Sequence, residues 1–468
     1  MIKNLKILFS DTILYGLSSV LAQFAGLFLV PFYTKELSPE EYAIVGLFAM
    51  VTAFFNPFIA FGLDSALFRY FAMAKSNYIK KRLFSTAFFV KIVIVIFFIL
   101  LLFPCYDLLN KYIFDEGISI LMFYLFLGSL LFNNVFSLAY VSLRVERKVK
   151  KIVLINIICL IVSLSLSIWL VLIRKLGVEG VMIAALSTSI TKGFLYYFNV
   201  KSKLFINMIG FKKLKFLLEY GMPLIPHKVF SQALNLFVLF LINNKLGLTV
   251  AGLFVVSKKF GKPISFLVSM VQTAWSPYKF EIHKNEIYPE KVFAQLISFY
   301  WTFLIFLWLI LSLISPWLFK LLIDERYWDG IDFIPVIMLI PIFEAFKFTV
   351  ITGFELSKDQ KQMSIATIYS SVVVVIFLFF WFNFYQPYNF MIAQIVSYLF
   401  FGIFIYIKAR KIIKIHYPFK YILSLFILSS FIILVFYNMF NILYLILLFS
   451  LIPIIIYKLI ISTKEIKE

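Results

Sequence analysis

Positively charged side chains inside long apolar segments are the residues of this chain whose types and spacing could do chemistry. Lys228, next to His227, lies in one such segment, and Lys258, Lys259 and Lys262 lie in the next. A charged side chain in the middle of a bilayer costs roughly 2.5 kcal/mol or more, so it normally faces water or a partner. Lys258 and Lys262 are four residues apart and share one helix face. The four lysines are therefore predicted to form a cationic cavity for an anion such as a diphosphate. Snorkelling to the outer membrane surface is the alternative for Lys258 and Lys259.

Two prolines set the surroundings of Lys228. Pro223 and Pro226 precede it closely, and together they must bend or break the helix and free carbonyl groups for other partners. A bent helix beside a cation is typical of transporter sites, although a purely structural bend explains the prolines as well. Lys228 also has the alternatives of reaching the cytoplasmic interface or pairing with Glu219.

Further charged residues of the predicted spans are candidates for a gate or for ion coupling: Asp64, Arg69, Lys91, Glu219 and Glu344. Asp64 and Arg69 close the second span, where they form a gate, a salt bridge between lobes, or a helix cap. Lys91 begins close enough to the membrane surface to snorkel. Glu344 and Lys347 are three residues apart on one helix and are predicted to form an ion pair.

The composition shows which elements must position these residues. The chain has 468 residues, of which 63% are hydrophobic and 14% are charged, and its mean hydropathy is +0.98. Apolar blocks of about 20 residues alternate with short polar loops, which is the pattern of a helical polytopic membrane protein. The net charge of +21 needs no nucleic acid, because basic loops beside anionic lipid account for it.

The apolar blocks predict about fourteen transmembrane helices. In chain order they are 12–32, 42–63, 83–103, 118–143, 152–173, 181–199, 217–242, 251–274, 292–319, 333–354, 363–384, 388–407, 421–437 and 442–458. Lysine and arginine concentrate in alternate loops, such as 144–151 and 201–215, which places these loops and both termini in the cytoplasm. The N-terminal segment Met1–Ser10 lacks the small-residue cleavage site of a signal peptide, so the first span is expected to be a retained helix.

Enzyme chemistry finds no support in the motifs. The chain has three histidines and two cysteines, without the spacing of a metal site, a phosphate-binding loop or a catalytic triad. No catalytic residue, metal ligand or cofactor is predicted. A membrane polymerase or glycosyltransferase would need a large outer loop, whereas the longest outer loop here is 320–332.

Several motifs resemble those of polysaccharide-biosynthesis membrane proteins of the O-antigen flippase type. The matching stretches are Tyr15-Gly16-Leu17, Pro31-Phe32-Tyr33-Thr34, Leu37-Ser38-Pro39-Glu40-Glu41-Tyr42, Phe61-Gly62-Leu63-Asp64-Ser65-Ala66, Arg69-Tyr70, Glu219-Tyr220-Gly221-Met222-Pro223-Leu224-Ile225-Pro226, Gly252-Leu253-Phe254, Lys258-Lys259 and Trp275-Ser276-Pro277-Tyr278. The resemblance covers the first twelve spans and is most specific at the N-terminus. The two additional C-terminal spans are similar to those of lipid II flippases.

The resemblance implies a fold of the multidrug/oligosaccharidyl-lipid/polysaccharide exporter superfamily. Two six-helix lobes would be related by a pseudo-twofold axis along the membrane normal. The expected N-lobe is 1–200, the cytoplasmic linker 201–215 and the C-lobe 216–410, and 411–468 holds the last helix pair and a cytoplasmic tail.

The function implied is the flipping of an undecaprenyl-diphosphate-linked oligosaccharide across the bacterial plasma membrane by alternating access. Membrane lipids, a polysaccharide polymerase and glycosyltransferases are the expected partners, and nucleic acid is not. A multidrug or small-solute exporter of the same superfamily and a membrane polysaccharide polymerase remain the alternative functions.

Overall fold

The computed structural model describes residues 26–74, 76–285, 288–352, 361–381, 387–409, 415, 417 and 419–437. This part of the chain is helical throughout and contains no strand. It divides into two compact units, Met1–Val256 and Ser257–Glu468, and each is described by itself. The lobe division predicted from the sequence lies earlier, at 201–215.

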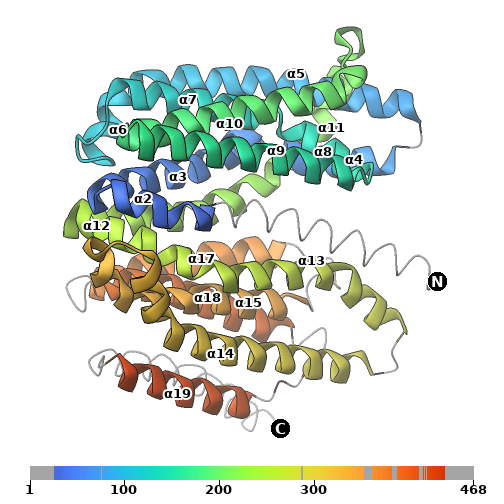
Figure 1. The fold of residues 1–468 in the computed structure, drawn as a ribbon. Coiled ribbons are helices and arrows are strands. Elements are labelled where there is room, and N and C mark those ends of the chain that lie inside the picture. The colour runs from blue at the N-terminus through green and yellow to red at the C-terminus, as the bar shows by residue number, and fades with distance from the viewer. Residues whose placement is uncertain are drawn as a thin grey trace. The chain divides into compact units, whose positions relative to one another are not determined.

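The first unit is a bundle of helices (Figure 1), and the apolar blocks of the sequence form these helices. Its α-helices are α2 (Val30–Glu36), α3 (Pro39–Ala60), α4 (Leu63–Met73), α5 (Asn77–Leu102), α6 (Tyr106–Tyr112), α7 (Ile120–Val135), α8 (Ser137–Val145), α9 (Val149–Ser167), α10 (Gly177–Val200), α11 (Phe211–Gly221) and most of α12 (Ile225–Phe260). The π-helix η2 (Ile168–Ile173) continues α9, and short 3-10 helices are η1 (Phe103–Cys105), η3 (Lys201–Lys203), η4 (Ile206–Met208) and η5 (Met222–Leu224). Helix α10 packs between α7 and α9, and α7 also packs on α5.

Local sequence explains where α3 begins and ends. Ser38 and Glu41 form a capping box, and Pro39 occupies the first turn, where its missing N–H is not needed. The helix ends at Phe61 and Gly62, which both have positive φ (48° and 70°). Two successive left-handed residues turn the chain sharply into α4, and this turn positions Asp64 at the first turn of α4.

The predicted linker is anchored to the first unit rather than hanging free of it. The Ser85 hydroxyl donates to the Lys203 carbonyl at 2.9 Å and accepts from the Phe205 N–H at 3.0 Å. The Lys203 ammonium also pairs with Glu146. Because the start of the linker is held on α5 and beside α8, it belongs to the first compact unit.

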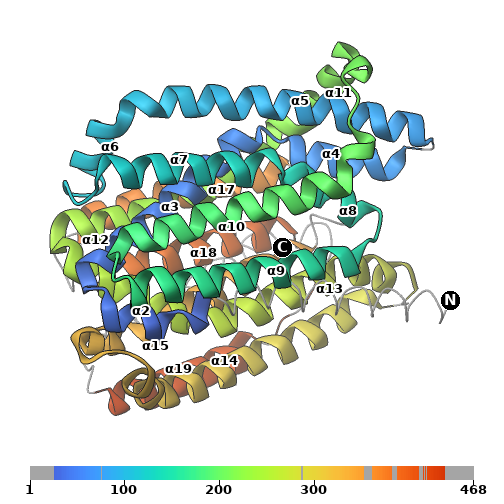
Figure 2. The ribbon, with the colours of Figure 1, turned by 45° about the horizontal axis from the view of Figure 1, so that its top comes forward.

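The second unit contains the end of α12 and the helices that follow it. These are α13 (Lys262–Asn285), α14 (Pro289–Leu322), the 3-10 helix η6 (Glu325–Phe333), α15 (Ile334–Val350), α17 (Lys361–Trp381), α18 (Tyr388–Ala409) and α19 (Phe419–Phe436). Helix α15 packs against α13, α14 and α18. Among the described apolar helices long enough to cross a membrane, the segment Glu325–Val350, formed by η6 and α15, has the largest share of buried residues. Helices α14 and α19 lie side by side (Figure 2).

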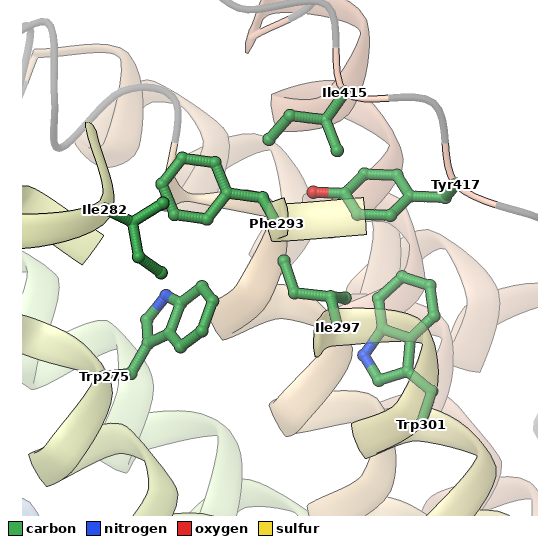
Figure 3. Close-up of a cluster of buried hydrophobic side chains, with 7 residues drawn as sticks. All are labelled: Trp275, Ile282, Phe293, Ile297, Trp301, Ile415 and Tyr417. Atoms are coloured by element: carbon green, nitrogen blue, oxygen red, sulfur yellow. The ribbon is translucent and has the colours of Figure 1, made fainter. Parts of the chain in front are cut away.

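An aromatic cluster ties α13 and α14 to the segment that precedes α19. Trp275 of α13 faces Phe293 of α14, and Trp301 of α14 packs on Tyr417 with ring centroids 5.4 Å apart (Figure 3). The Trp275 indole also donates to the Thr352 hydroxyl at 3.0 Å. The motif Trp275-Ser276-Pro277-Tyr278 thus begins with a packing residue of the second unit.

The predicted membrane architecture is confirmed. Ten described helices are long and apolar enough to cross a membrane, and a shorter apolar helix covers Ile365–Leu378. Each predicted span from 42–63 to 421–437 falls on a described helix, while most of 12–32 and all of 442–458 lie outside the described residues. The chain is an all-α multi-pass membrane protein.

Several details differ from the predicted spans. The predicted spans 217–242 and 251–274 are not separated by a loop, because α12 continues to Phe260 with a kink at Gly247 (φ 85°), and the break comes instead at Gly261. The predicted span 217–242 is divided by η5 at Pro223, since proline cannot continue the hydrogen-bond ladder, so the long helix begins only at Ile225. The predicted outer loop 320–332 instead forms the end of α14 and η6, in which Tyr327 is wholly buried.

Candidate functional site

A helix break in the second unit presents three of the four lysines predicted to bind an anion. Lys258 and Lys259 lie in the last turn of α12, Gly261 forms a turn, and Lys262 is the first residue of α13. Pro263 has no N–H, so the Lys259 carbonyl loses the donor that a continuous helix would supply. Lys258 and Lys259 are half-buried and Lys262 is exposed.

Helix α15 brings a carboxylate to these lysines. Glu344 is exposed although the preceding turns of α15 are buried. It lies within electrostatic range of Lys258, Lys262 and Lys347. We call Lys258, Lys259, Lys262, Lys347 and Glu344 the lysine cluster. Four ammonium groups against one carboxylate leave this cluster with an excess of positive charge.

The ion pair predicted between Glu344 and Lys347 is wrong. Both residues are described, and no salt bridge joins them. The Lys347 ammonium lies instead 4.4 Å from the ring centroid of Phe401 and 5.5 Å from that of Tyr398, both on α18. These aromatic faces stabilise the cation through their quadrupoles, and Glu344 forms no salt bridge with any residue that the structure describes.

The first unit contains an ion pair between α4 and α5, in which Lys91 is buried and Asp64 is partly exposed. The Lys91 side chain is 0% exposed, and its Nζ lies 3.5 Å from Asp64 Oδ2. The Ser137 hydroxyl donates to Asp64 Oδ1 at 2.9 Å. The prediction that Lys91 snorkels is therefore wrong, because its ammonium is wholly buried beside the partly exposed Asp64 carboxylate, which a tertiary contact brings to it.

Lys228 belongs to this first-unit network. Its ammonium donates to the Ser65 hydroxyl at 2.9 Å, and its charge acts on Lys91. The structure thus joins Lys228 to Asp64, Ser65 and Lys91, while Lys258, Lys259 and Lys262 belong to the second unit. The alternative partner Glu219 lies 3.9 Å from Lys215, with both side chains exposed.

Two of the motifs that carry the family resemblance meet at this network. A Cβ built on Gly62 would lie 2.2 Å from the Gly221 carbonyl oxygen, and one on Gly221 would lie 2.7 Å from that of Gly62. The Arg69 guanidinium lies 4.7 Å from the ring centroid of Tyr220. The start of α4 and the end of α11 are therefore in direct backbone contact, a proximity that neither motif shows by itself.

Lys192 on α10 is an intramembrane cation that the hydropathy pattern did not single out. It lines a cavity of about 250 Å³ with seven other residues, namely Phe132, Asn133, Phe136, Ser137, Tyr140, Asn156 and Tyr196. Its signal in the sequence is the polar run Ser187-Thr188-Ser189-Ile190-Thr191-Lys192 inside an otherwise apolar span. Across the part of the chain that the structure describes, no group of His, Cys, Asp or Glu is arranged to hold a metal ion.

Comparison with solved structures identifies proteins of similar fold. The inward-closed lipid II flippase MurJ is similar over 98% of this chain and 100% of its own, with a TM-score of 0.72 and 16% identity. An inward-facing multidrug resistance MATE transporter of the MOP superfamily is similar over 88% of this chain and 95% of its own (TM-score 0.65, 15% identity). A MOP superfamily transporter from Pyrococcus furiosus, described as having a binding pocket of reverse polarity, is similar over 86% of this chain and 95% of its own (TM-score 0.57, 13% identity).

Sequence comparison is more specific about the family. No curated protein sequence matches the chain. The profile of the family described as "Polysaccharide biosynthesis protein" matches residues 35–332, which is more than half of the chain and includes the Asp64–Lys91 pair and three lysines of the lysine cluster. The chain therefore belongs to the polysaccharide biosynthesis protein family and has the fold of the MOP transporters.

Proposed function

We propose that this protein flips an undecaprenyl-diphosphate-linked oligosaccharide from the inner to the outer leaflet of the bacterial plasma membrane. It does so by alternating access, with both termini in the cytoplasm. The observation that carries the proposal is the positive excess of the lysine cluster, at a helix break, in a member of a polysaccharide-biosynthesis family. Membership points to a glycan substrate, and the cations point to an anionic group on it.

The chemistry of such a substrate fits the cluster. A diphosphate carries several anionic oxygens that accept charge-assisted hydrogen bonds from ammonium groups. Lysine presents a compact charge on a flexible stem, so several lysines can follow a diphosphate whose position changes during transport. The polyprenyl tail would stay in lipid while the charged head and its sugars pass through a wet route.

The alternative functions fit less well. A multidrug exporter for organic cations would need acidic groups, whereas Glu344 is outnumbered by four lysines in this cluster. A polysaccharide polymerase needs catalytic groups on an outer loop, and the candidate loop forms the short η6 helix with Tyr327 and Phe333 buried.

Complementation tests the proposal. Cells that lack the protein would receive the parent chain or the variant in which Lys228, Lys258, Lys259 and Lys262 are all alanine. Surface polysaccharide and leaflet location of the lipid-linked precursor would be measured at matched expression. We expect the variant to lose surface polysaccharide and to leave its precursor on the cytoplasmic side.

A matched control removes the same charge from four exposed lysines: Lys35, Lys111, Lys150 and Lys151. Two of these lie in predicted outer loops and two in a predicted cytoplasmic loop, so the charge bias that sets topology is preserved. Full polysaccharide display by the first variant, or equal loss in the control, would contradict the proposal.

A further inference from the structure

The Lys192 cavity in the first unit is separate from the lysine cluster and remains without a role in the proposed transport route. Four helices build it, α7, α8, α9 and α10, which lie together in Figure 2. The cavity opens where α7 ends at Phe136 and α8 begins at Ser137, a break that leaves room between these helices and α10.

The lining is mixed in a specific way. Phe132, Phe136, Tyr140 and Tyr196 supply aromatic rings, while Asn133, Asn156 and Ser137 supply groups that bind hydroxyls. Flat aromatic faces beside amide and hydroxyl groups suit a ligand that is apolar on its ring faces and polar around its edge. A sugar ring has this character.

Lys192 adds a positive charge to the cavity. It is half-buried, and no hydrogen bond or ion pair joins it to any residue in the described part of the chain. It interacts electrostatically with Cys159 of α9. A desolvated ammonium without a counter-charge is costly, so an anion entering the cavity would be stabilised.

Size restricts what the cavity can hold. Its volume of about 250 Å³ is below the range of roughly 300–1,000 Å³ typical of sites for drug-sized ligands. One small ring with its substituents fits this volume, whereas a whole repeat unit of several sugars does not.

We infer that this cavity is a subsite for one acidic monosaccharide, whose anionic group pairs with Lys192 and whose ring packs on Tyr140, which the buried Tyr196 supports from behind. The inference rests on the proposed function for its biological context, and it names the sugar class that the function leaves open. A uronic acid and a sugar phosphate share the required chemistry, namely an anionic oxygen group on a sugar ring.

The subsite has a direct link to the charge pair of the first unit. Ser137 lines the cavity and its hydroxyl donates to Asp64 Oδ1. A ligand that attracts this hydroxyl would take a hydrogen bond from Asp64 and change the surroundings of Lys91.

A binding experiment on the full-length protein in detergent tests the subsite without requiring transport. Thermal stabilisation would be titrated with methyl glucuronide, a methyl glucose phosphate, methyl glucoside and inorganic phosphate. We expect saturable stabilisation by one or both acidic sugars at concentrations roughly ten- to a hundredfold below those at which methyl glucoside or phosphate acts, the factor of one charge-assisted hydrogen bond. Comparison of the two acidic sugars distinguishes the carboxylate from the phosphate source.

Three variants complete the test. Lys192→Gln should remove the preference for acidic sugars, Lys192→Arg should keep most of it, and Lys151→Gln on the exposed surface of α9 should bind like the parent. Equal binding of methyl glucoside or inorganic phosphate, or an unchanged preference in Lys192→Gln, would overturn the subsite. Because this readout is binding, its failure leaves the result of the complementation test on the lysine cluster untouched, and the reverse also holds.

Discussion

The Asp64–Lys91 pair of the first unit and the lysine cluster of the second unit hold charge in different ways. In the pair, Lys91 is buried, Asp64 is partly exposed, and the Ser137 hydroxyl donates to Asp64. In the second unit, the exposed Glu344 carboxylate lies within electrostatic range of Lys258, Lys262 and Lys347, and Lys259, Lys262 and Glu344 form no salt bridge with any described residue. A balanced pair stabilises a particular arrangement of helices, whereas an unbalanced, accessible group is available to a ligand.

The sharpest way to break this comparison is to remove one half of the ion pair. Asp64→Asn leaves the buried Lys91 ammonium without a counter-charge, and we expect a loss of about 1–3 kcal/mol in stability, less than for a wholly buried pair because Asp64 is partly exposed. Thermal unfolding and protease resistance of the detergent-purified protein measure it. The double variant Asp64→Asn/Lys91→Met should recover most of the loss, because it removes both charges together. If the double variant were as unstable as the single one, the pair would not be the cause.

A smaller effect is expected from Glu146, at the cytoplasmic end of the first unit. Burial alone would raise the pKa of Glu146, but hydrogen bonds from Lys148 (2.7 Å) and Lys203 (2.5 Å) outweigh burial and lower the pKa below its usual range. A lowered folded-state pKa means that the group stabilises the fold above the unfolded pKa of about 4.3 and loses this contribution as the pH falls through the folded value.

Glu146→Gln should therefore lower stability by about 0.2–1 kcal/mol at pH 7 and make the acid limb of the stability curve less steep. Unfolding temperatures measured between roughly pH 3 and pH 7, the range over which carboxylates titrate, give both quantities. Equal slopes for parent and variant would show that another carboxylate controls acid unfolding. Glu219→Gln, at an exposed pair with Lys215, provides the matched control.

The smallest change in stability is expected in the second unit. Glu344→Gln removes an exposed carboxylate that forms no salt bridge with a described residue, so the free energy of unfolding should change by no more than about 0.5 kcal/mol. The cluster nevertheless gains positive charge, and we expect tighter retention of inorganic diphosphate by the purified protein. Calorimetry measures the binding, and an unfolding temperature as low as that of Asp64→Asn would contradict the contrast between the units.

Much of the fold follows from hydropathy alone, because a lipid-exposed helix must be apolar along its length. The break at Pro223 also follows from local chemistry. The partner of Lys91 does not, since Asp64 is on another helix and only packing brings the two together. Lys347 shows the same limit, because the i, i+3 spacing with Glu344 predicted a pair while the rings of Phe401 and Tyr398 on α18 were closer.

Lys192 escaped prediction for a different reason. Its span has the lowest mean hydropathy, 1.2, among the ten described helices that are apolar enough to cross a membrane, so one more polar residue did not stand out. What distinguishes Lys192 is the cavity beside it, and a cavity arises from the joint packing of four helices. No single stretch of sequence contains that information.

The contact between Gly62 and Gly221 has a consequence for how the family can change over evolutionary time. Each glycine leaves no room for a side chain at the other, so enlarging one cannot be offset by shrinking its neighbour. In most contacting pairs a larger residue at one position can be compensated by a smaller residue at the other, but neither glycine can be replaced by a smaller residue. We therefore expect both glycines to persist together in descendants that keep this helix junction, and to be lost together only where the junction itself is rebuilt.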